Sequence, residues 1–239
     1  MVVEKENIIN STYFREYRNK LGFTNQNEVK DFFGAKNITP DIDFNYIKLL
    51  NKRLFEIVEK VNSVIPISVK IENLNLFKEN CIEHPFKIMK ENNILSALNN
   101  QGRRPEQVYF SWMRGFVISN IFLKAIGVIF DVNIKKIKLI GDDNFKKPES
   151  FKRSPKADLE IQINKEEKIR IEIQSGFTGI NDIKQHKVLE AKKIFIESKI
   201  DTIAIHFDLY NGQIALLKLN EIKNNDVNWI TRQQMEGQT

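Results

Sequence analysis

Two short segments in the second half of the chain alternate strictly between apolar and polar residues. They cover residues 158–163 and 168–174, and a charged turn at residues 164–167 separates them. Alternation with a period of two indicates half-buried strands, so the pair predicts a β-hairpin. One face carries the apolar side chains that would enter the core: Leu159, Ile161, Ile163, Ile169, Ile171 and Ile173. The other face carries Asp158, Glu160, Gln162, Arg170, Glu172 and Gln174.

The polar face of this hairpin is rich in carboxylates. Neighbouring carboxylates repel one another unless a positive charge lies between them, and a divalent metal ion is one candidate for that charge. Asp158 and Glu172 lie opposite each other on this face only if the hairpin loop has an odd number of residues or contains a bulge. For Glu160 we favour a cross-strand ion pair with Arg170 over metal binding.

Hydrophobic spacing predicts the remaining elements. Helices are expected at residues 11–21, 27–33, 41–65, 84–99, 105–126 and 180–199, and strands at 132–140, 202–207 and 213–217. Residues 67–84 are ambiguous, and a strand at 68–71 followed by a loop is our expectation. From residue 105 onward the order is helix, three strands, helix, two strands. That order predicts a mixed α/β sheet flanked by helices, in a unit of residues 101–239 that follows a mostly helical region of residues 1–100.

Composition adds few constraints. The formal charge of +6 makes a polyanionic partner plausible, and the single cysteine, Cys81, excludes an internal disulfide and a thiolate zinc cage. The chain starts without an apolar signal segment, and its longest apolar stretch, residues 116–130, is interrupted by Asn120 and Lys124. We therefore expect a cytoplasmic protein that does not enter a membrane. No two histidines stand at metal-ligand spacing, and His206 falls within an apolar strand.

This order of elements, with an acidic hairpin in the middle, resembles the catalytic core of the PD-(D/E)XK nuclease superfamily, which includes many type II restriction endonucleases. In that family an Asp opens one strand, and Glu or Asp, any residue and Lys follow on the next. Asp158 and Glu172 match the two acids, Gln174 stands in the place of the Lys, and Pro155 lies three residues before the Asp. The resemblance covers residues 105 to about 218 by element order.

The resemblance implies a restriction-endonuclease-like fold and Mg²⁺-dependent hydrolysis of DNA. Asp158 and Glu172 would hold one or two Mg²⁺ ions, and the backbone carbonyl of Ile173 could add a ligand. Gln174 would orient the attacking water but has no charge, so the metal would have to activate that water. Glu106, in the first turn of the helix before the core, is a secondary candidate for an auxiliary acid.

A lysine from the helix at residues 180–199 could supply the charge that Gln174 lacks. Lys184 and Lys187 flank the apolar stripe of that helix, and either could reach toward the hairpin. We include Lys187 among the candidate catalytic residues.

Two basic segments are candidates for DNA contacts. One, in the loop that leads into the hairpin, would contact phosphates through Lys152, Arg153 and Lys156. The other, in the loop before residue 105, could read bases or clamp a phosphate through Gln101, Arg103 and Arg104.

We therefore expect a sequence-specific double-stranded DNA endonuclease of the type II restriction class. It would act as a homodimer, because two strands of a symmetric site need two active centres, and the helical N-terminal region would supply dimer contacts and recognition. Two alternatives stay open. One is a DNA repair or recombination nuclease with the same core, and the other is a non-catalytic DNA-binding protein with a decayed site.

Overall fold

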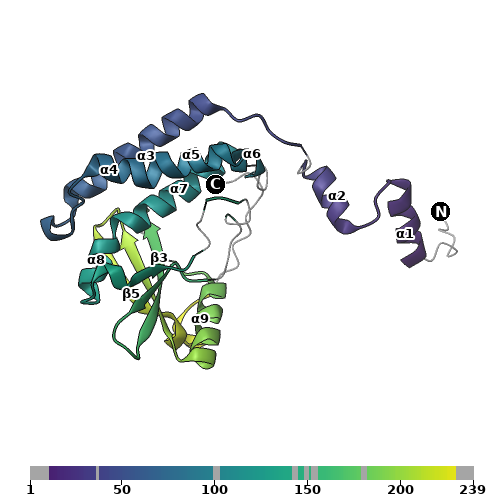
Figure 1. The fold of residues 1–239 in the computed structure, drawn as a ribbon. Helices are drawn as coiled ribbons and strands as arrows, with labels where there is room; N and C mark the ends of the chain where they lie inside the picture. Colours follow the sequence, from purple (N-terminus) through teal and green to yellow (C-terminus); the bar gives the residue numbers. More distant parts are fainter. Residues whose placement is uncertain are drawn as a thin grey trace.

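The computed structural model describes residues 11–35, 38–98, 103–141, 145–147, 151, 156–178 and 182–229. A five-stranded mixed sheet is flanked by helices, and a helical region precedes it (Figure 1). The predicted mixed α/β class is thus confirmed. The strands are β1 Ile137–Leu139, β2 Leu159–Gln162, β3 Lys168–Gly176, β4 Asp201–Asp208 and β5 Gln213–Lys218. The helices are α1 Ser11–Lys20, α2 Gln26–Phe33, α3 Phe44–Val64, α4 Leu74–Lys78, α5 His84–Glu91, α6 Ile94–Ala97, α7 Pro105–Ile121, α8 Leu123–Ile129 and α9 Gln185–Ser198.

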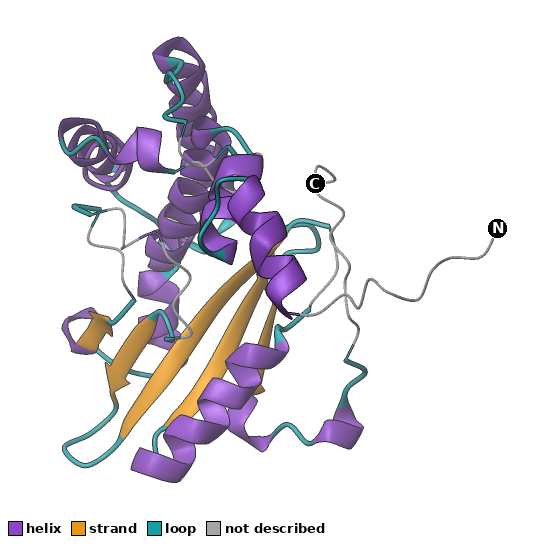
Figure 2. Ribbon diagram, turned by 90° about the vertical axis from the view of Figure 1, so that its right-hand side faces the viewer, coloured by secondary structure: helices purple, strands orange, loops and turns teal. Residues whose placement is uncertain are grey.

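The strands lie side by side in chain order, β1 to β5. β3 and β4 run parallel, whereas the other neighbouring pairs are antiparallel. A parallel pair needs a crossover connection, and α9 supplies it. The predicted order from residue 105 onward is therefore confirmed, and Figure 2 shows the resulting sheet with helices packed against it.

The two faces of the sheet bury different side chains. The larger core cluster joins alternate residues of the hairpin, such as Leu159 and Ile171, to α7, α8 and the N-terminal helices. The smaller cluster, on the opposite face, contains Val188 and Ala191 of α9 together with Ala204 of β4. Because strand side chains alternate between faces, the apolar hairpin residues enter the larger core while the polar ones point toward α9. The predicted division of the hairpin into two faces is confirmed.

The hairpin meets the condition that places Asp158 opposite Glu172. Gln162 pairs with Lys168, so five residues, 163–167, connect the strands, an odd number. Leu159 pairs with Ile171, which puts Asp158 and Glu172 at the next position of the ladder. The regular hydrogen-bond pattern between the two strands shifts at Asp158, whose N–H donates to the carbonyl of Ile171 at 3.0 Å. Such local shifts re-aim side chains next to functional sites.

The strand predicted at residues 68–71 is wrong. Residues Ile67–Val69 form a 3₁₀ turn, and α4 and a π-helical turn at Glu79–Glu83 follow it. The side chain of Asn62 accepts the N–H of Ile71 at 2.8 Å and donates to its carbonyl at 3.2 Å. These bonds satisfy the backbone N–H and carbonyl of Ile71, which in a strand would pair with a neighbouring strand.

Several predicted elements are shorter than the patterns suggest. The helix expected at residues 84–99 breaks at Asn93, which has a left-handed backbone with φ 54°. The helix expected at residues 105–126 divides at Phe122 into α7 and α8. The strand expected at residues 132–140 is reduced to β1, since Asn133 caps a 3₁₀ turn by accepting the N–H of Lys135 at 2.9 Å.

Among the described residues, no single helix is long and apolar enough to cross a membrane. α7 and α8 reach that length only as a pair, and they bend by 44° at their junction.

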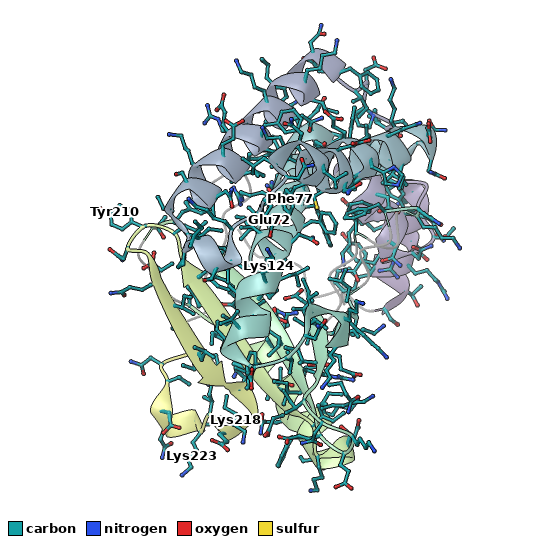
Figure 3. The ribbon with its side chains drawn as sticks, turned by 60° about the vertical axis from the view of Figure 1, so that its left-hand side comes forward. Glu72, Phe77, Lys124, Tyr210, Lys218 and Lys223 are labelled. Atoms are coloured by element: carbon teal, nitrogen blue, oxygen red, sulfur yellow. The ribbon has the colours of Figure 1, made fainter. Side chains whose placement is uncertain are left out.

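Ion pairs link neighbouring elements of the fold. Lys124 of α8 lies 2.9 Å from Glu72, in the segment before α4, and also donates to the carbonyl of Lys70 at 3.3 Å (Figure 3). Lys218 at the end of β5 binds Asp201 at 2.9 Å and Glu221 at 2.8 Å. By contrast, α1 and α2 stand apart from the sheet in Figure 1 and bury none of their residues.

Candidate functional site

Asp158, which directly precedes β2, is held in place from both neighbouring strands. Its carboxylate Oδ2 accepts the backbone N–H of Ile173 on β3 at 2.7 Å. Its carbonyl accepts the N–H of Ile140, next to β1, at 3.0 Å. The side chain therefore has a fixed position at the point where the hairpin ladder shifts. The sequence-based prediction named the carbonyl of Ile173 as a possible metal ligand; the structure places the Ile173 backbone here, with its N–H toward the carboxylate.

Glu172 and Lys187 form a buried ion pair beside Asp158. Glu172 lies in the middle of β3 with 7% of its surface exposed. Lys187, in the first turn of α9, donates from Nζ to Glu172 Oε2 at 3.0 Å and to the carbonyl of Lys156 at 3.1 Å. α9 can deliver this lysine because it crosses the same sheet face that carries the polar hairpin residues. Of the two lysines considered from the sequence, Lys187 is the one that reaches Glu172.

The two carboxylates disturb each other's titration. Burial raises the pKa of Glu172 to about 7, and the nearby charge of Asp158 contributes, while Lys187 opposes the shift. Burial also raises the pKa of Asp158, against the N–H of Ile173 and the charge of Lys187. One lysine therefore does not fully compensate two buried carboxylates, and an additional cation would stabilise their charged forms.

The donor set fits Mg²⁺ better than a softer metal. Mg²⁺ commonly binds through one or two carboxylates and keeps several waters, which two neighbouring acids beside a pocket allow. Within the described ranges, no group of three or more His, Cys, Asp or Glu side chains is arranged to hold a metal. A site built from Asp158 and Glu172 would therefore leave most positions around the ion to water and substrate oxygens.

A pocket of about 380 Å³ opens at the C-terminal end of β3, next to the ion pair. Glu172, Gln174 and Lys187 all line it, and so does Lys184. No described residue hydrogen-bonds to the side-chain amide of Gln174, so its donors and acceptor stay available to a ligand or water. The structure thus brings Asp158, Glu172, Gln174 and Lys187 into one place.

His206 lines the same pocket and was not among the residues selected from the sequence. It pairs with Gln174 across β3 and β4, is 8% exposed, and neither ring nitrogen has a hydrogen-bond partner in the described part of the chain. Its chain neighbours Ile205 and Phe207 enter the larger core. Because side chains alternate along a strand, the sequence could have indicated that His206 faces α9. Its pairing with Gln174 depends on how β3 and β4 align. Because α9 separates these two strands in the chain, no local sequence pattern gives that alignment.

Glu106 lies in different surroundings. Its side chain is fully buried in the first turn of α7, where Oε1 accepts the backbone N–H of Asp43 at 2.8 Å. Arg104 donates to both of its oxygens, at 3.1 and 3.0 Å. Burial alone would raise the pKa of Glu106, but these hydrogen bonds outweigh it, so the pKa lies below its ordinary value. The described contacts of Glu106 connect α7 to the start of α3.

These contacts lead us to expect a structural role for Glu106. Glu106→Gln should lower the free energy of unfolding by about 1–3 kcal/mol, because Arg104 and the N–H of Asp43 lose a charged acceptor. Any cleavage activity of the folded variant should fall less than about tenfold. Urea unfolding and cleavage rates measured on the same preparation test this; a large rate loss at unchanged stability would instead support Glu106 as an auxiliary acid.

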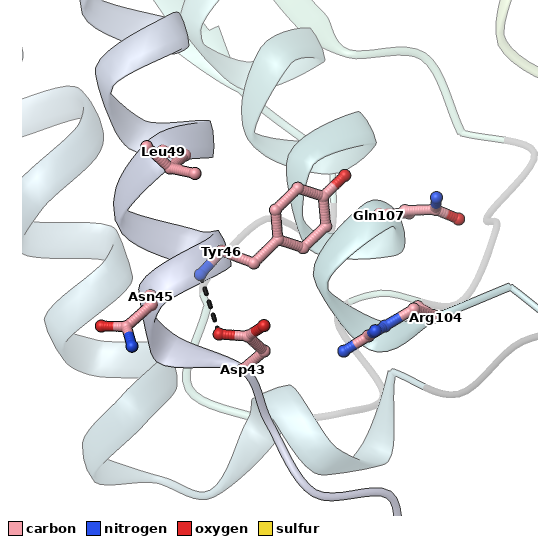
Figure 4. A pocket seen from close by; sticks show the side chains of 6 residues that line it. All are labelled: Asp43, Asn45, Tyr46, Leu49, Arg104 and Gln107. Carbon is pink, nitrogen blue, oxygen red and sulfur yellow. Dashed lines mark hydrogen bonds between the residues drawn. The ribbon is translucent and has the colours of Figure 1, made fainter.

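The residues predicted to contact DNA are only partly described. Gln101, Lys152 and Arg153 lie outside the described residues. Lys156 is exposed beside the candidate site. Arg104 is engaged with Glu106 and, with Asp43 and Tyr46 of the α3 end, lines a separate pocket of about 510 Å³ (Figure 4). Arg103 donates from Nη2 to Ser111 Oγ at 2.9 Å.

The ion pair expected between Glu160 and Arg170 is wrong. The two residues are opposite each other, as predicted, but Glu160 accepts from Lys168 at 3.1 Å and Arg170 lies 3.7 Å from Glu190 of α9. The reason is that α9 covers this face of the sheet and places Glu190 beside Arg170.

Cys81 does not have the properties of a nucleophile. Burial raises the pKa of its thiol to about 11, so the thiol stays protonated near neutral pH.

Comparison of the chain with protein-family models, with curated proteins and with solved structures finds no match in any of the three.

The raised pKa of Glu172 predicts a pH-dependent stability. In the folded chain Glu172 keeps its proton up to about pH 7, whereas its ordinary value is 4.5. The folded state thus binds more protons between these values, and the free energy of unfolding should fall by up to about 3 kcal/mol as the pH rises through this window. Glu172→Gln should remove this loss.

Urea unfolding of wild type and Glu172→Gln without metal, at about pH 5 and about pH 8, measures the difference. Glu160→Gln, on β2 and on the same face of the sheet, should keep the wild-type pH dependence. Equal pH dependence in wild type and Glu172→Gln would show that Glu172 titrates normally.

Proposed function

We propose that this chain is a Mg²⁺-dependent endonuclease of double-stranded DNA, built on the PD-(D/E)XK core of type II restriction enzymes. The observation that carries the proposal is the convergence of Asp158, Glu172 and Lys187, with Lys187 Nζ 3.0 Å from Glu172 Oε2. The family pattern asks for two acids and a lysine, and the sequence had Gln174 in the lysine's place. Lys187 brings the missing positive charge to the same acid from α9.

Each residue of the site has a role in this proposal. Asp158 and Glu172 would hold Mg²⁺, which supplies Lewis-acid polarisation of the phosphate and a more acidic water. Gln174 would hold the attacking water through its free amide, and Lys187 would stabilise the negative charge that grows on the phosphate. Asp158 is prepositioned for this by the N–H of Ile173, so little reorganisation is needed when a metal binds.

The proposal includes a homodimer that acts on a symmetric DNA sequence. α1 and α2 are candidates for contacts between copies, because they bury none of their residues and expose aromatic side chains such as Tyr17 and Phe33. Light scattering of the purified chain tests the dimer directly, since a mass near that of one chain would exclude it.

One observation favours a second candidate, a non-catalytic DNA-binding protein. The ion pair of Lys187 with Glu172 partly neutralises the site without any metal. Such an arrangement would also stabilise a fold whose catalytic site has decayed.

Incubation with long viral DNA, with Mg²⁺ and with EDTA, separates the candidates. A restriction enzyme gives discrete fragments that require Mg²⁺. Smearing, or cutting of branched junctions alone, would support a repair or recombination nuclease. Salt-sensitive binding without cutting would support the decayed site.

A further inference from the structure

Two arginines of the α7 region lie close together without an acid. Arg103 donates to Ser111, which is three residues from Arg114 and therefore on the same face of α7. Neither guanidinium forms an ion pair with an Asp or Glu within the described ranges, and Arg103 Nε is buried without a hydrogen-bond partner there. Burial lowers the pKa of Arg114, and the like charge of Arg103 lowers it further.

Aromatic rings fix the position of Arg114. Its guanidinium carbon lies 5.7 Å from the ring centre of Phe110 and 5.0 Å from that of Phe177. Stacking of this kind holds the guanidinium in place and leaves the N–H groups at its edge available. A neutral side chain could pack on the same rings without the repulsion from Arg103. The fold alone therefore does not account for two cations here.

The arginine pair lies beside the candidate catalytic pocket. Phe177 follows β3 directly and lines the pocket together with Glu172 and Gln174. Arg114 thus contacts a residue that lines the candidate pocket, and Arg103 lies beside Arg114.

We infer that Arg103 and Arg114 form a binding site for a backbone phosphate of the DNA, next to the phosphate that is cut. This inference rests on the proposed function and assigns the pair to the backbone, not to base reading. Guanidinium forks match phosphate oxygens, and a phosphate would place an anion between the two like charges. The stacked rings would hold Arg114 ready for that contact before DNA arrives.

The test is the salt dependence of DNA binding, measured by fluorescence anisotropy on a labelled duplex without Mg²⁺. Arg114→Gln and Arg103→Gln should each reduce the slope of log K against log salt by about 0.9, the value for one lost phosphate contact. Arg53→Gln is the matched control, because Arg53 is exposed on α3 and pairs with Glu56. It loses the same charge and should keep the wild-type slope.

Arg103→Gln keeps the test decisive if Arg114→Gln unfolds, since Arg103 is not stacked on these rings. Unchanged slopes, an equal change in Arg53→Gln, or no DNA binding by the wild type would overturn the inference. Free phosphate is the other possible source of the anion, and the shift of the unfolding temperature on addition of inorganic phosphate tests it. If Arg103→Gln lost this shift while its DNA slope stayed at the wild-type value, the pair would be assigned to free phosphate. Wild-type slopes in a chain that cuts DNA would refute this inference alone, whereas reduced slopes in a chain that never cuts would refute the proposed function alone.

Discussion

Asp158→Asn and Glu172→Gln are each expected to reduce DNA cleavage by about 1,000-fold or more while DNA binding stays within about threefold of wild type. The two carboxylates are the proposed Mg²⁺ ligands, and a bound metal contributes several kcal/mol to the stabilisation of the transition state. Both substitutions keep the size of the side chain and remove its charge. In Glu172→Gln the loss should not come from unfolding, because the substitution also removes the cost of burying a second negative charge.

Glu160→Gln is the control for this prediction. Glu160 lies on the same face of the hairpin, two residues from Asp158, and pairs with Lys168. It should cut at the wild-type rate. The measurement is the rate of plasmid cleavage at saturating Mg²⁺, with binding followed separately in EDTA. Cleavage at the wild-type rate by either Asp158→Asn or Glu172→Gln would remove that residue from the site.

Lys187→Met is expected to reduce the cleavage rate by about 100- to 1,000-fold, with little change in the affinity for DNA. Within the part of the chain that the structure describes, Lys187 is the one positive side chain bonded to Glu172, and the loss of a group that stabilises transition-state charge has an effect of this size. Its removal should also raise the pKa of Glu172 further, since Lys187 lowers it. The pH–rate profile of the variant should therefore move to higher pH, and Lys187→Arg should recover part of the rate.

Two other lysines show whether this effect is specific. Lys193 is exposed on α9 and pairs only loosely with Glu197, at 3.8 Å, so Lys193→Met should behave as wild type. Lys184 lines the pocket, whereas the described lysine bond to Glu172 comes from Lys187. Lys184→Met should therefore have a smaller effect than Lys187→Met. If Lys184→Met lost the larger share of activity, the lysine of the site would be Lys184. If none of the three changed the rate, Gln174 and the metal would have to act without a lysine.

The parts of the site that depend on local pattern could be predicted from the sequence. Strict alternation gave the two faces of the hairpin. Whether Asp158 faces Glu172 depended on the length of the hairpin loop, which the pattern left open: the expected turn at residues 164–167 has four residues, whereas five, 163–167, connect the paired strands. The position of Lys187 on a helix that must cross the same sheet face made its reach toward Glu172 a reasonable expectation.

The parts that depend on packing between distant segments could not. Arg170 turns to Glu190 because α9 covers it, and His206 reaches the pocket through the parallel register of β4. Arg114 gained one of its two aromatic neighbours, Phe177, from the segment just after β3, 63 residues later in the chain. The segment after residue 66 also failed as a strand, because Asn62 had already satisfied the backbone of Ile71. In each case the deciding partner lies on another element.

The most direct test of the account is the conversion of supercoiled plasmid by the purified chain with Mg²⁺ and with EDTA, beside the Asp158→Asn variant. We expect linear product with Mg²⁺ from the wild type, none in EDTA, and at most traces from the variant. Plasmid that stays supercoiled with Mg²⁺ under conditions where the wild type binds DNA, or equal cutting by Asp158→Asn, would contradict it.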